Sequence, residues 1–299
     1  MPAGTVDELR AELAAHDYLA DEGLATAVFL ALRLERPLLL EGEAGVGKTE
    51  LARVLATSTG GELIRLQCYE GIDVAQAVYE WDYARQLLHL RAAEGRGAGG
   101  DAVEDELYSE RFLLRRPLLR AIAHDPVDGP RPVLLIDEID RADDEFEAFL
   151  LEILADSAVT VPELGTFTAA QPPIVVITSN RTRDVHDALK RRCLFHWVEL
   201  PDFDREVAIV LARAPEVGAA LARQVAAATA ELRELGLYKP PGIAETIDWA
   251  TALVVLGRDE LDEGSVLATL GAVLKYREDQ QRVREHGLAD LVRRAVRQA

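Results

Sequence analysis

The sequence predicts an α/β fold, with a five-stranded parallel sheet flanked by helices and then an all-helical region. Three observations support this prediction. Segments with helical spacing separate five short apolar runs rich in Val, Ile and Leu, at residues 38–40, 63–66, 133–136, 174–177 and 197–200. Runs this short suit strands buried on both faces, and helices between successive strands favour parallel pairing. From residue 201 onward the strand-like runs stop, and helical segments rich in Ala, Leu and Val follow.

The segments around these runs predict further elements of the fold. Residues 6–34 carry apolar side chains at three- and four-residue steps, which predicts helices before the first strand. Residues 94–105 are glycine-rich and then acidic, which predicts a mobile surface loop. Residues 159–172 place β-forming residues on both sides of a Pro- and Gly-containing turn, which predicts a hairpin before the fourth strand. The change of pattern near residue 201 predicts a domain boundary.

The composition bounds the class of protein. The chain has 299 residues, of which 49% are hydrophobic, and a net charge of -19. This charge argues against non-specific nucleic-acid binding and against docking to anionic membranes. Two cysteines, Cys68 and Cys193, are too few for a disulfide framework or a zinc cluster, which indicates a reducing compartment. Neither a signal-peptide pattern nor an apolar run of membrane-spanning length is present in the sequence, so we expect a cytoplasmic protein.

One motif predicts a nucleotide site. Residues 42–49 read Gly-Glu-Ala-Gly-Val-Gly-Lys-Thr, which is the full phosphate-binding pattern G-x-x-x-x-G-K-[ST]. Its glycines let the backbone aim N–H groups at phosphate oxygens. Lys48 supplies a positive charge for the β- and γ-phosphates, and Thr49 offers a hydroxyl to Mg²⁺. An apolar run before the loop and helical spacing after it give the strand, loop and helix arrangement that binds phosphate. The predicted contacts are Gly42, Glu43, Ala44, Gly45, Val46, Gly47, Lys48, Thr49 and Glu50.

Polar residues at the ends of later runs predict the rest of this site. Asp137 and Glu138 follow the third run, where we expect Asp137 to hold Mg²⁺ and Glu138 to polarise an attacking water. Asn180 ends the fourth run and can orient that water, although Asn is also typical of turns. The basic cluster 190–192 is either a solvated helix end or the source of an arginine that reaches a neighbouring subunit's γ-phosphate.

Together these motifs resemble those of AAA+ ATPases of the MoxR family. The resemblance depends on the loop at 42–49, Leu-Ile-Asp-Glu-Ile-Asp-Arg-Ala at 135–142, Thr-Ser-Asn at 178–180 and Ala-Leu-Lys-Arg-Arg-Cys at 188–193. Within this family, the chain resembles the CoxD-like branch that accompanies carbon-monoxide dehydrogenase and related molybdenum hydroxylases. The segments that carry this finer resemblance are 66–73, 79–88 and 191–197.

The resemblance implies an architecture and a function. It implies a sheet of strand order 5-1-4-3-2 in a nucleotide-binding domain over residues 1–200, with insertions at about 79–125 and 159–172, and a helical lid domain over residues 201–299. It also implies ATP and Mg²⁺ as cofactors and a homo-oligomeric ring, commonly a hexamer. The implied activity is chaperone-like remodelling or metal-centre maturation of a client metalloenzyme, with a partner that carries a von Willebrand factor A domain.

The resemblance also implies roles for single residues. Lys48 matches the phosphate-loop lysine, and Thr49 and Asp137 match the Mg²⁺ site. Glu138 matches the water-activating acid, and Asn180 matches the first sensor. Arg192 matches the arginine finger, with Arg191 as the second choice, and Arg141 matches an arginine that implies a subunit contact. One departure concerns the second sensor, which is usually an arginine near the start of a lid helix. Residues 239–245 read Lys-Pro-Pro-Gly-Ile-Ala-Glu and leave Lys239 as the substitute.

Other interpretations remain open. A nucleic-acid-directed motor or loader of the same superfamily is disfavoured by the net charge, and a nucleotide-switched binding module with little turnover is disfavoured by Glu138 and Asn180. The sequence contains no base-reading signature that separates ATP from GTP. His186 and His196 near Cys193 lack the paired spacing of metal ligands. The alternating aromatics Tyr79, Trp81 and Tyr83 are more typical of packing than of a substrate-gripping face.

Overall fold

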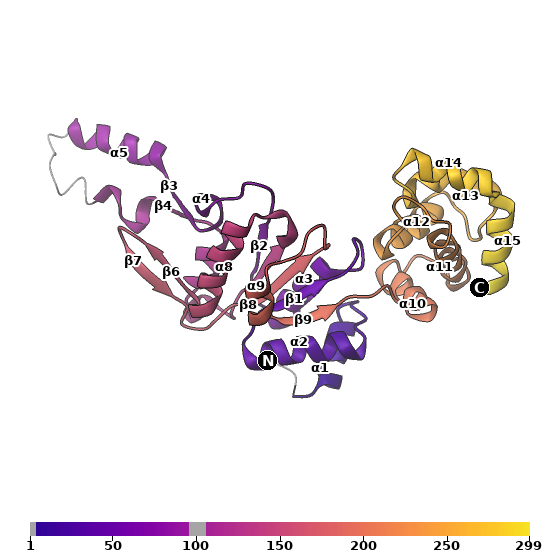
Figure 1. Cartoon of the computed structure of the whole chain (residues 1–299), viewed down its shortest axis with the longest axis horizontal. Coiled ribbons are helices and arrows are strands. Elements are labelled where there is room, and N and C mark those ends of the chain that lie inside the picture. Colours follow the sequence, from indigo (N-terminus) through magenta and orange to yellow (C-terminus); the bar gives the residue numbers. More distant parts are fainter. Residues whose placement is uncertain (1–3, 96–105) are drawn as a thin grey trace. The chain divides into compact units, whose positions relative to one another are not determined.

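The computed structural model describes residues 4–95 and 106–299, and the chain divides into two compact units (Figure 1). The first unit comprises Met1–Leu9, Gly23–Glu41 and Ala52–His196, and the second comprises Arg10–Glu22, Gly42–Leu51 and Trp197–Ala299. Residues 96–105, which make up most of the predicted mobile loop at 94–105, lie outside the described residues.

A five-stranded parallel sheet forms the centre of the first unit. Its strands are β1 (Leu38–Glu41), β2 (Leu63–Gln67), β5 (Val133–Asp137), β8 (Ile174–Ser179) and β9 (Leu194–Trp197). Their order is β2-β5-β8-β1-β9, which confirms the predicted order 5-1-4-3-2. Every residue of the three central strands β5, β8 and β1 is buried. This burial explains why their sequences are continuous apolar runs without alternation.

The predicted position of the fifth strand is wrong by three residues. The strand covers Leu194–Trp197 instead of residues 197–200, and its pairing begins where the Leu194 N–H donates to the Pro37 carbonyl at 2.8 Å. Because β9 lies at the edge of the sheet, half-buried and exposed residues alternate along it, and Phe195 is exposed. The prediction assumed a strand buried on both faces, so it placed the strand at residues 197–200 and missed the alternating pattern of β9.

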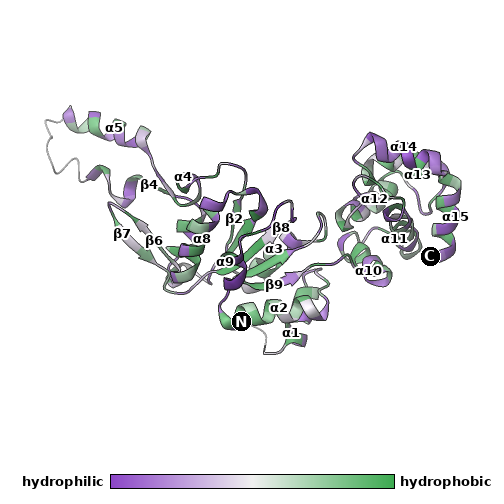
Figure 2. Ribbon diagram, in the orientation of Figure 1, coloured by the Kyte–Doolittle hydropathy of each residue, from purple (hydrophilic) through white to green (hydrophobic). Residues whose placement is uncertain are grey.

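Helices cover the sheet and supply the rest of the core. The predicted helical segment at 6–34 contains α1 (Val6–Ala14) and α2 (Glu22–Leu34), and α3 (Lys48–Thr59) follows β1. All of α2 except Glu22 belongs to the first unit, whereas α1 and α3 are divided between the two units. The other helices of the first unit are α4 (Val74–Ala77), α5 (Tyr83–Glu94), α7 (Pro117–Ile122), α8 (Asp144–Asp156) and α9 (Asp187–Arg192). Leu118 and Leu119 of α7 and Phe146 and Leu150 of α8 are buried with the apolar residues of β2 and β5. Figure 2 shows the hydrophobic colouring of β2 and β8.

Two small antiparallel sheets interrupt the alternation of strands and helices. β3 (Tyr79–Trp81) pairs with β4 (Leu113–Arg115), and α5 leaves the end of β3. β6 (Ala158–Val161) pairs with β7 (Gly165–Thr168), which confirms the predicted hairpin. Trp81 is buried and meets Tyr79 and Tyr108 edge to face at centroid distances of 6.2 and 5.4 Å. Tyr83, in contrast, begins α5 and is 67% exposed, so the alternation of aromatics does not continue through it.

The second unit includes six consecutive helices after β9. They are α10 (Phe203–Arg213), α11 (Ala219–Arg233), α12 (Ile243–Val255), α13 (Glu263–Val273), α14 (Arg277–His286) and α15 (Leu288–Gln298). Trp249 is fully buried among them, and its Nε1–H donates to Thr269 Oγ1 at 2.7 Å. Within residues 4–95 and 106–299, we find no helix with both the length and the apolar character needed to cross a membrane.

Candidate nucleotide site

The sheet brings the predicted acids and the start of the phosphate loop to one edge. β5 pairs with β8 in parallel, and β8 pairs with β1 in parallel. Ile136 is in register with Ile177, and Glu41 is in register with Ser179. The residues after these positions therefore emerge together at the carboxyl edge of the sheet, where ligands of open α/β sheets bind. Gly42 directly follows Glu41, so the phosphate loop starts from this edge through the continuity of the chain.

The phosphate loop has the backbone that its glycines were expected to allow. Gly45 and Gly47 have φ angles of +81° and +91°, in the left-handed region that favours glycine. Lys48 begins α3 and is buried, and its Nζ donates to the carbonyl oxygens of Gly42 at 2.8 Å and Glu43 at 2.6 Å. A buried ammonium needs such acceptors. In this conformation Lys48 stabilises the loop that it belongs to.

The start of α12 packs against this loop within the second unit. The Ala244 N–H donates to the Gly45 carbonyl at 3.3 Å. Gly242 passes so close that a Cβ added to it would lie 2.8 Å from the Ala44 carbonyl oxygen. The Glu245 carboxylate accepts a hydrogen bond from the Gly242 N–H at 2.9 Å and caps the helix start. A carboxylate therefore lies in the first turn of the helix that contacts the phosphate loop.

Lys239, the predicted substitute for the second sensor, lies before this helix. It is exposed, and its backbone N–H donates to Asp279 Oδ2 at 3.1 Å. The first turn of α12 itself carries no arginine or lysine in its sequence. The helix start that contacts the phosphate loop therefore provides neither the arginine expected of a second sensor nor a lysine in its place.

Asp137 is a buried carboxylate at the end of β5. Thr178 of the neighbouring strand donates its hydroxyl to Asp137 Oδ1 at 2.6 Å, and Arg65 Nε donates to Oδ2 at 3.0 Å. The Glu138 N–H in turn donates to Thr178 Oγ1 at 2.9 Å. An anionic oxygen ligand of this kind suits Mg²⁺, which prefers hard oxygen donors, and the Arg65 guanidinium already provides one positive charge beside it. Asp137 thus has the ligand chemistry of its predicted metal role, which stays a prediction.

Glu138 and Asn180, predicted separately, are in contact. Asn180 Nδ2 donates to Glu138 Oε1 at 3.3 Å. Glu138 Oε2 accepts from Gln67 Nε2 at 3.1 Å and lies 2.9 Å from Arg141 Nε. The backbone of Glu138 has a φ of +56° and a ψ of +52°, a strained left-handed conformation for a residue with a side chain. Gln67 and Arg141 thus contact the predicted water-activating acid within the same chain, and the sequence predicted neither contact.

Asp140 is a residue of this site that the sequence prediction missed. It lies in the short 3₁₀ helix η3 (Ile139–Arg141) and is only 3% exposed. Its Oδ1 accepts from the Asn180 N–H at 3.2 Å, and its Oδ2 accepts from the Thr182 N–H at 2.9 Å and hydroxyl at 2.6 Å. Burial by itself raises the pKa of Asp140, but these hydrogen bonds outweigh it and hold the pKa below its ordinary value. The signal in the sequence was a third acid, directly after Ile139 and three residues beyond the end of β5.

The basic cluster at the end of α9 divides into two parts. Lys190 Nζ lies 3.5 Å from the buried carboxylate of Glu41. The carbonyl oxygens of Arg191 and Arg192 accept hydrogen bonds from the Arg36 guanidinium at 2.9 and 3.2 Å. A guanidinium at a helix C-terminus stabilises the last carbonyls and the helix dipole. The side chains of Arg191 and Arg192 themselves are exposed.

The residues around Cys193 have local structural contacts. Among the residues that the structure describes, no group of three or more His, Cys, Asp or Glu side chains is placed to hold a metal ion. The His186 ring accepts from the Ala188 N–H at 3.2 Å and caps α9. Burial raises the pKa of the Cys193 thiol to about 12, and burial and nearby acids raise that of Cys68 to about 12, so both remain protonated thiols.

A family model described as an AAA domain of the dynein-related subfamily matches residues 37–193. The chain belongs to this family. The matched range includes the phosphate loop, the acids after β5 and the end of β8. The chain therefore has the AAA+ fold of P-loop nucleotide-hydrolysing enzymes, with a helical region after the sheet.

Individual relatives of this AAA protein are distant. The uncharacterized protein YehL of Escherichia coli K12 is 28% identical over 193 residues, which are 61% of this chain and 47% of YehL. The ATP-dependent Clp protease ATP-binding subunit ClpL of Lactococcus lactis is 30% identical over 142 residues, which are 48% of this chain and 16% of ClpL. The chain thus matches less than half of the length of each relative. Among solved structures, the Thermotoga maritima RuvB Holliday junction branch migration motor aligns with a TM-score of 0.47, 17% identity, and coverage of 90% of this chain and 72% of RuvB.

Proposed function

We propose that this AAA protein is a Mg²⁺-dependent ATPase that cleaves the bond between the β- and γ-phosphates of ATP. The observation that carries the proposal is the shared sheet edge. Asp137 and the Asn180-bonded Glu138 emerge where β1 runs directly into the glycine loop. Ligands of open α/β sheets bind at this edge, and phosphoryl transfer needs the three parts that the chain carries: a phosphate-binding loop, a metal-binding acid and a water-activating acid.

The residues of the chain divide the chemistry among them. Loop N–H groups and Lys48 would bind the phosphates, while Thr49 and Asp137 would hold Mg²⁺, which when bound neutralises charge that develops on the phosphate oxygens. Glu138 would polarise the attacking water, and Asn180 would orient it. A hydrogen bond from Gln67 and an ion pair with Arg141 stabilise the Glu138 carboxylate in its present conformation. These contacts compete with a water for the same oxygens, so we expect turnover to require that they loosen.

The same proposal assigns the exposed arginines of α9 to a neighbouring subunit's site. Arg192, with Arg191 as the second choice, would act as the arginine finger in a homo-oligomeric ring, which we propose to be a hexamer. A finger supplied by another subunit contributes about 10³-fold or more to kcat. The activity per subunit should therefore rise steeply with protein concentration as the ring assembles.

The proposed use of this hydrolysis is chaperone-like remodelling of a client protein. The segments 66–73, 79–88 and 191–197, which resemble the branch that accompanies carbon-monoxide dehydrogenase, support metal-centre maturation of a molybdenum hydroxylase as the specific task. A partner with a von Willebrand factor A domain belongs to the same proposal. Co-purification from the native host, followed by identification of the bound proteins, tests the client and the partner together.

Two substitutions test the ATPase itself. Lys48→Ala should weaken ATP binding, because the charge for the β- and γ-phosphates is lost. Glu138→Gln should leave ATP binding intact and abolish phosphate release, because the amide cannot accept the proton of the water. Glu145→Gln, an exposed glutamate in the first turn of α8, is the matched control and should hydrolyse ATP like the wild type. Normal turnover in Glu138→Gln would show that another residue activates the water.

A further inference from the structure

Glu41 is a buried carboxylate that lies beside the ammonium group of Lys190. It is the last residue of β1, directly before the phosphate loop, and only 3% of it is exposed. Lys190 Nζ of α9 lies 3.5 Å from Glu41 Oε1, and this oxygen accepts no hydrogen bond within the part of the chain that the structure describes. Removing a carboxylate from water is costly unless an opposite charge compensates it, and Lys190 provides that charge. The proposed ATPase gives this pair no task.

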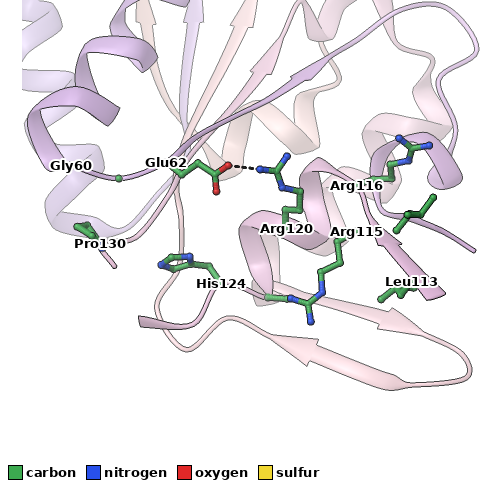
Figure 3. A pocket seen from close by; sticks show the side chains of 11 residues that line it. Gly60, Glu62, Leu113, Arg115, Arg116, Arg120, His124 and Pro130 are labelled. Atoms are coloured by element: carbon green, nitrogen blue, oxygen red, sulfur yellow. Dashed lines mark hydrogen bonds and ion pairs between the residues drawn. The ribbon is translucent and has the colours of Figure 1, made fainter. Parts of the chain in front are cut away.

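The exposed ion pairs around a pocket at the amino edge of the sheet provide a contrast (Figure 3). This pocket of about 880 Å³ lies where β2 and β5 begin, opposite to the predicted acids, and Arg115, Arg116 and Arg120 line it. Each arginine pairs with a glutamate of the same chain, as Figure 3 shows for Arg120 and Glu62. The side chains of these pairs are between 38% and 58% exposed, whereas the Glu41 side chain is 4% exposed. Breaking an exposed pair costs little, but removing the partner of a buried charge costs far more.

Lys190 belongs to the end of α9 that carries the proposed arginine finger. Arg191 and Arg192 directly follow it, and their side chains are exposed. Arg36, shortly before β1, donates to the backbone carbonyls of Arg191 and Arg192. The two ends of β1 therefore hold the same end of α9, Arg36 through the backbone and Glu41 through the Lys190 side chain. This arrangement ties the exposed arginines to the strand that leads into the phosphate loop.

We propose that Glu41 is a positioning residue for the arginine finger. By pairing with Lys190, it fixes where Arg191 and Arg192 are presented to the neighbouring subunit. A long side chain stabilises a transition state only when its charged group is held in place, and a small displacement loses much of the effect. The inference rests on the proposed ring and its shared finger. It implies that Glu41 acts mainly on the neighbour's site, although it lies beside the phosphate loop of its own subunit.

Mixed rings of full-length subunits distinguish an effect on the neighbour's site from an effect on the subunit's own site. Donor subunits carry Glu138→Gln, which stops their own turnover and keeps their finger. Acceptor subunits carry Arg191→Ala and Arg192→Ala, which remove their finger and keep their site. Each variant alone should release little phosphate from ATP, and the mixture should regain turnover because acceptors use the fingers of donors. Light scattering ensures that only mixtures of equal oligomer mass are compared.

Glu41→Gln is then added to one kind of subunit at a time. In the donor it should lower the turnover of the mixture about tenfold or more, because the finger loses its support. In the acceptor the loss should be smaller by about fivefold or more, because the acceptor contributes no finger. Glu35→Gln in the donor is the matched control, since Glu35 is exposed and pairs with Arg131, which lies outside α9. It should keep turnover within about twofold of the parent mixture.

Lys190→Gln in the donor is the second variant, and it keeps the test sharp if Glu41→Gln fails to fold. It should reproduce the loss seen with Glu41→Gln. Because either substitution already breaks the pair, a donor with both should be about as active as a donor with one. Two losses that multiply would show that the residues act independently, and this result would overturn the inference.

Two further outcomes would overturn it. One is a donor with Glu41→Gln that is as effective as the Glu35→Gln control, and the other is an equal or larger loss when Glu41→Gln is in the acceptor. In both cases the proposed ATPase and its ring would stand. If the parent mixture stayed silent while the wild type released phosphate, the shared finger itself would be wrong, and the role of Glu41 with it.

Discussion

Replacing Asp140 with Asn tests whether this buried carboxylate organises the carboxyl edge of the sheet. Its two oxygens accept three hydrogen bonds, one from Asn180 and two from Thr182. The Asn side chain has the same shape but only one acceptor oxygen. If that oxygen keeps both Thr182 donors, the new NH₂ group faces the Asn180 N–H and one charge-assisted bond is lost. Such a bond contributes about 1.5–3 kcal/mol, so Asp140→Asn should destabilise the fold by about 2 kcal/mol.

Urea unfolding followed by circular dichroism measures this change, and the midpoint should fall at an unchanged slope. Asp143→Asn is the matched control, because Asp143 is exposed and caps α8 through Phe146 N, where Asn serves about as well. ATP turnover should fall in Asp140→Asn, since Asn180 loses the anchor of its backbone, and should persist in the control. If Asp140→Asn were as stable and as active as Asp143→Asn, the anchoring role assigned to Asp140 would be wrong.

Two more predictions follow from single contacts. The pKa of Asp140 is lower in the folded chain than its ordinary value of 3.8. The unfolded chain therefore binds this proton first as the pH falls. The stability that Asp140 contributes is complete above the pKa of the unfolded chain and is lost as the pH drops toward the pKa of the folded chain. Unfolding midpoints should consequently fall less steeply with acid in Asp140→Asn than in the wild type. Gly42→Ala should cost about 1–3 kcal/mol in urea unfolding, because its Cβ would lie 2.4 Å from the Val198 carbonyl oxygen. Gly271→Ala inside α13, which has room for a methyl group, should instead be neutral or stabilising by up to about 1 kcal/mol, and equal effects of the two changes would contradict the steric explanation.

The sequence predicted the central strands better than the edge strand β9. β1, β5 and β8 are buried on both faces, so only apolar residues are stable there and the runs are visible without a structure. β9 has an exposed side, and its alternation of half-buried and exposed residues was not recognised as a strand. The hairpin of β6 and β7 was predictable because Gly165, with a φ of +89°, supplies the backbone conformation that the turn requires.

The sequence did not predict the contacts between distant parts of the chain. No motif in the sequence linked Arg65 and Gln67 of β2 to the acids, yet strand pairing places them beside Asp137 and Glu138. Asp140 falls inside a recognised motif, but its role depends on the segment after β8 that lies against it.

By itself, the sequence determined that this chain has a phosphate loop, a strand ending in two acids and a sheet that carries both, because fixed local spacing and continuous burial leave direct marks on residue type. Only the tertiary structure decided which side chains surround Glu138, how Asp140 anchors the neighbouring strand end, and that three arginines gather around a pocket at the opposite edge. Those arrangements depend on pairing between residues far apart in the chain, which local spacing does not encode.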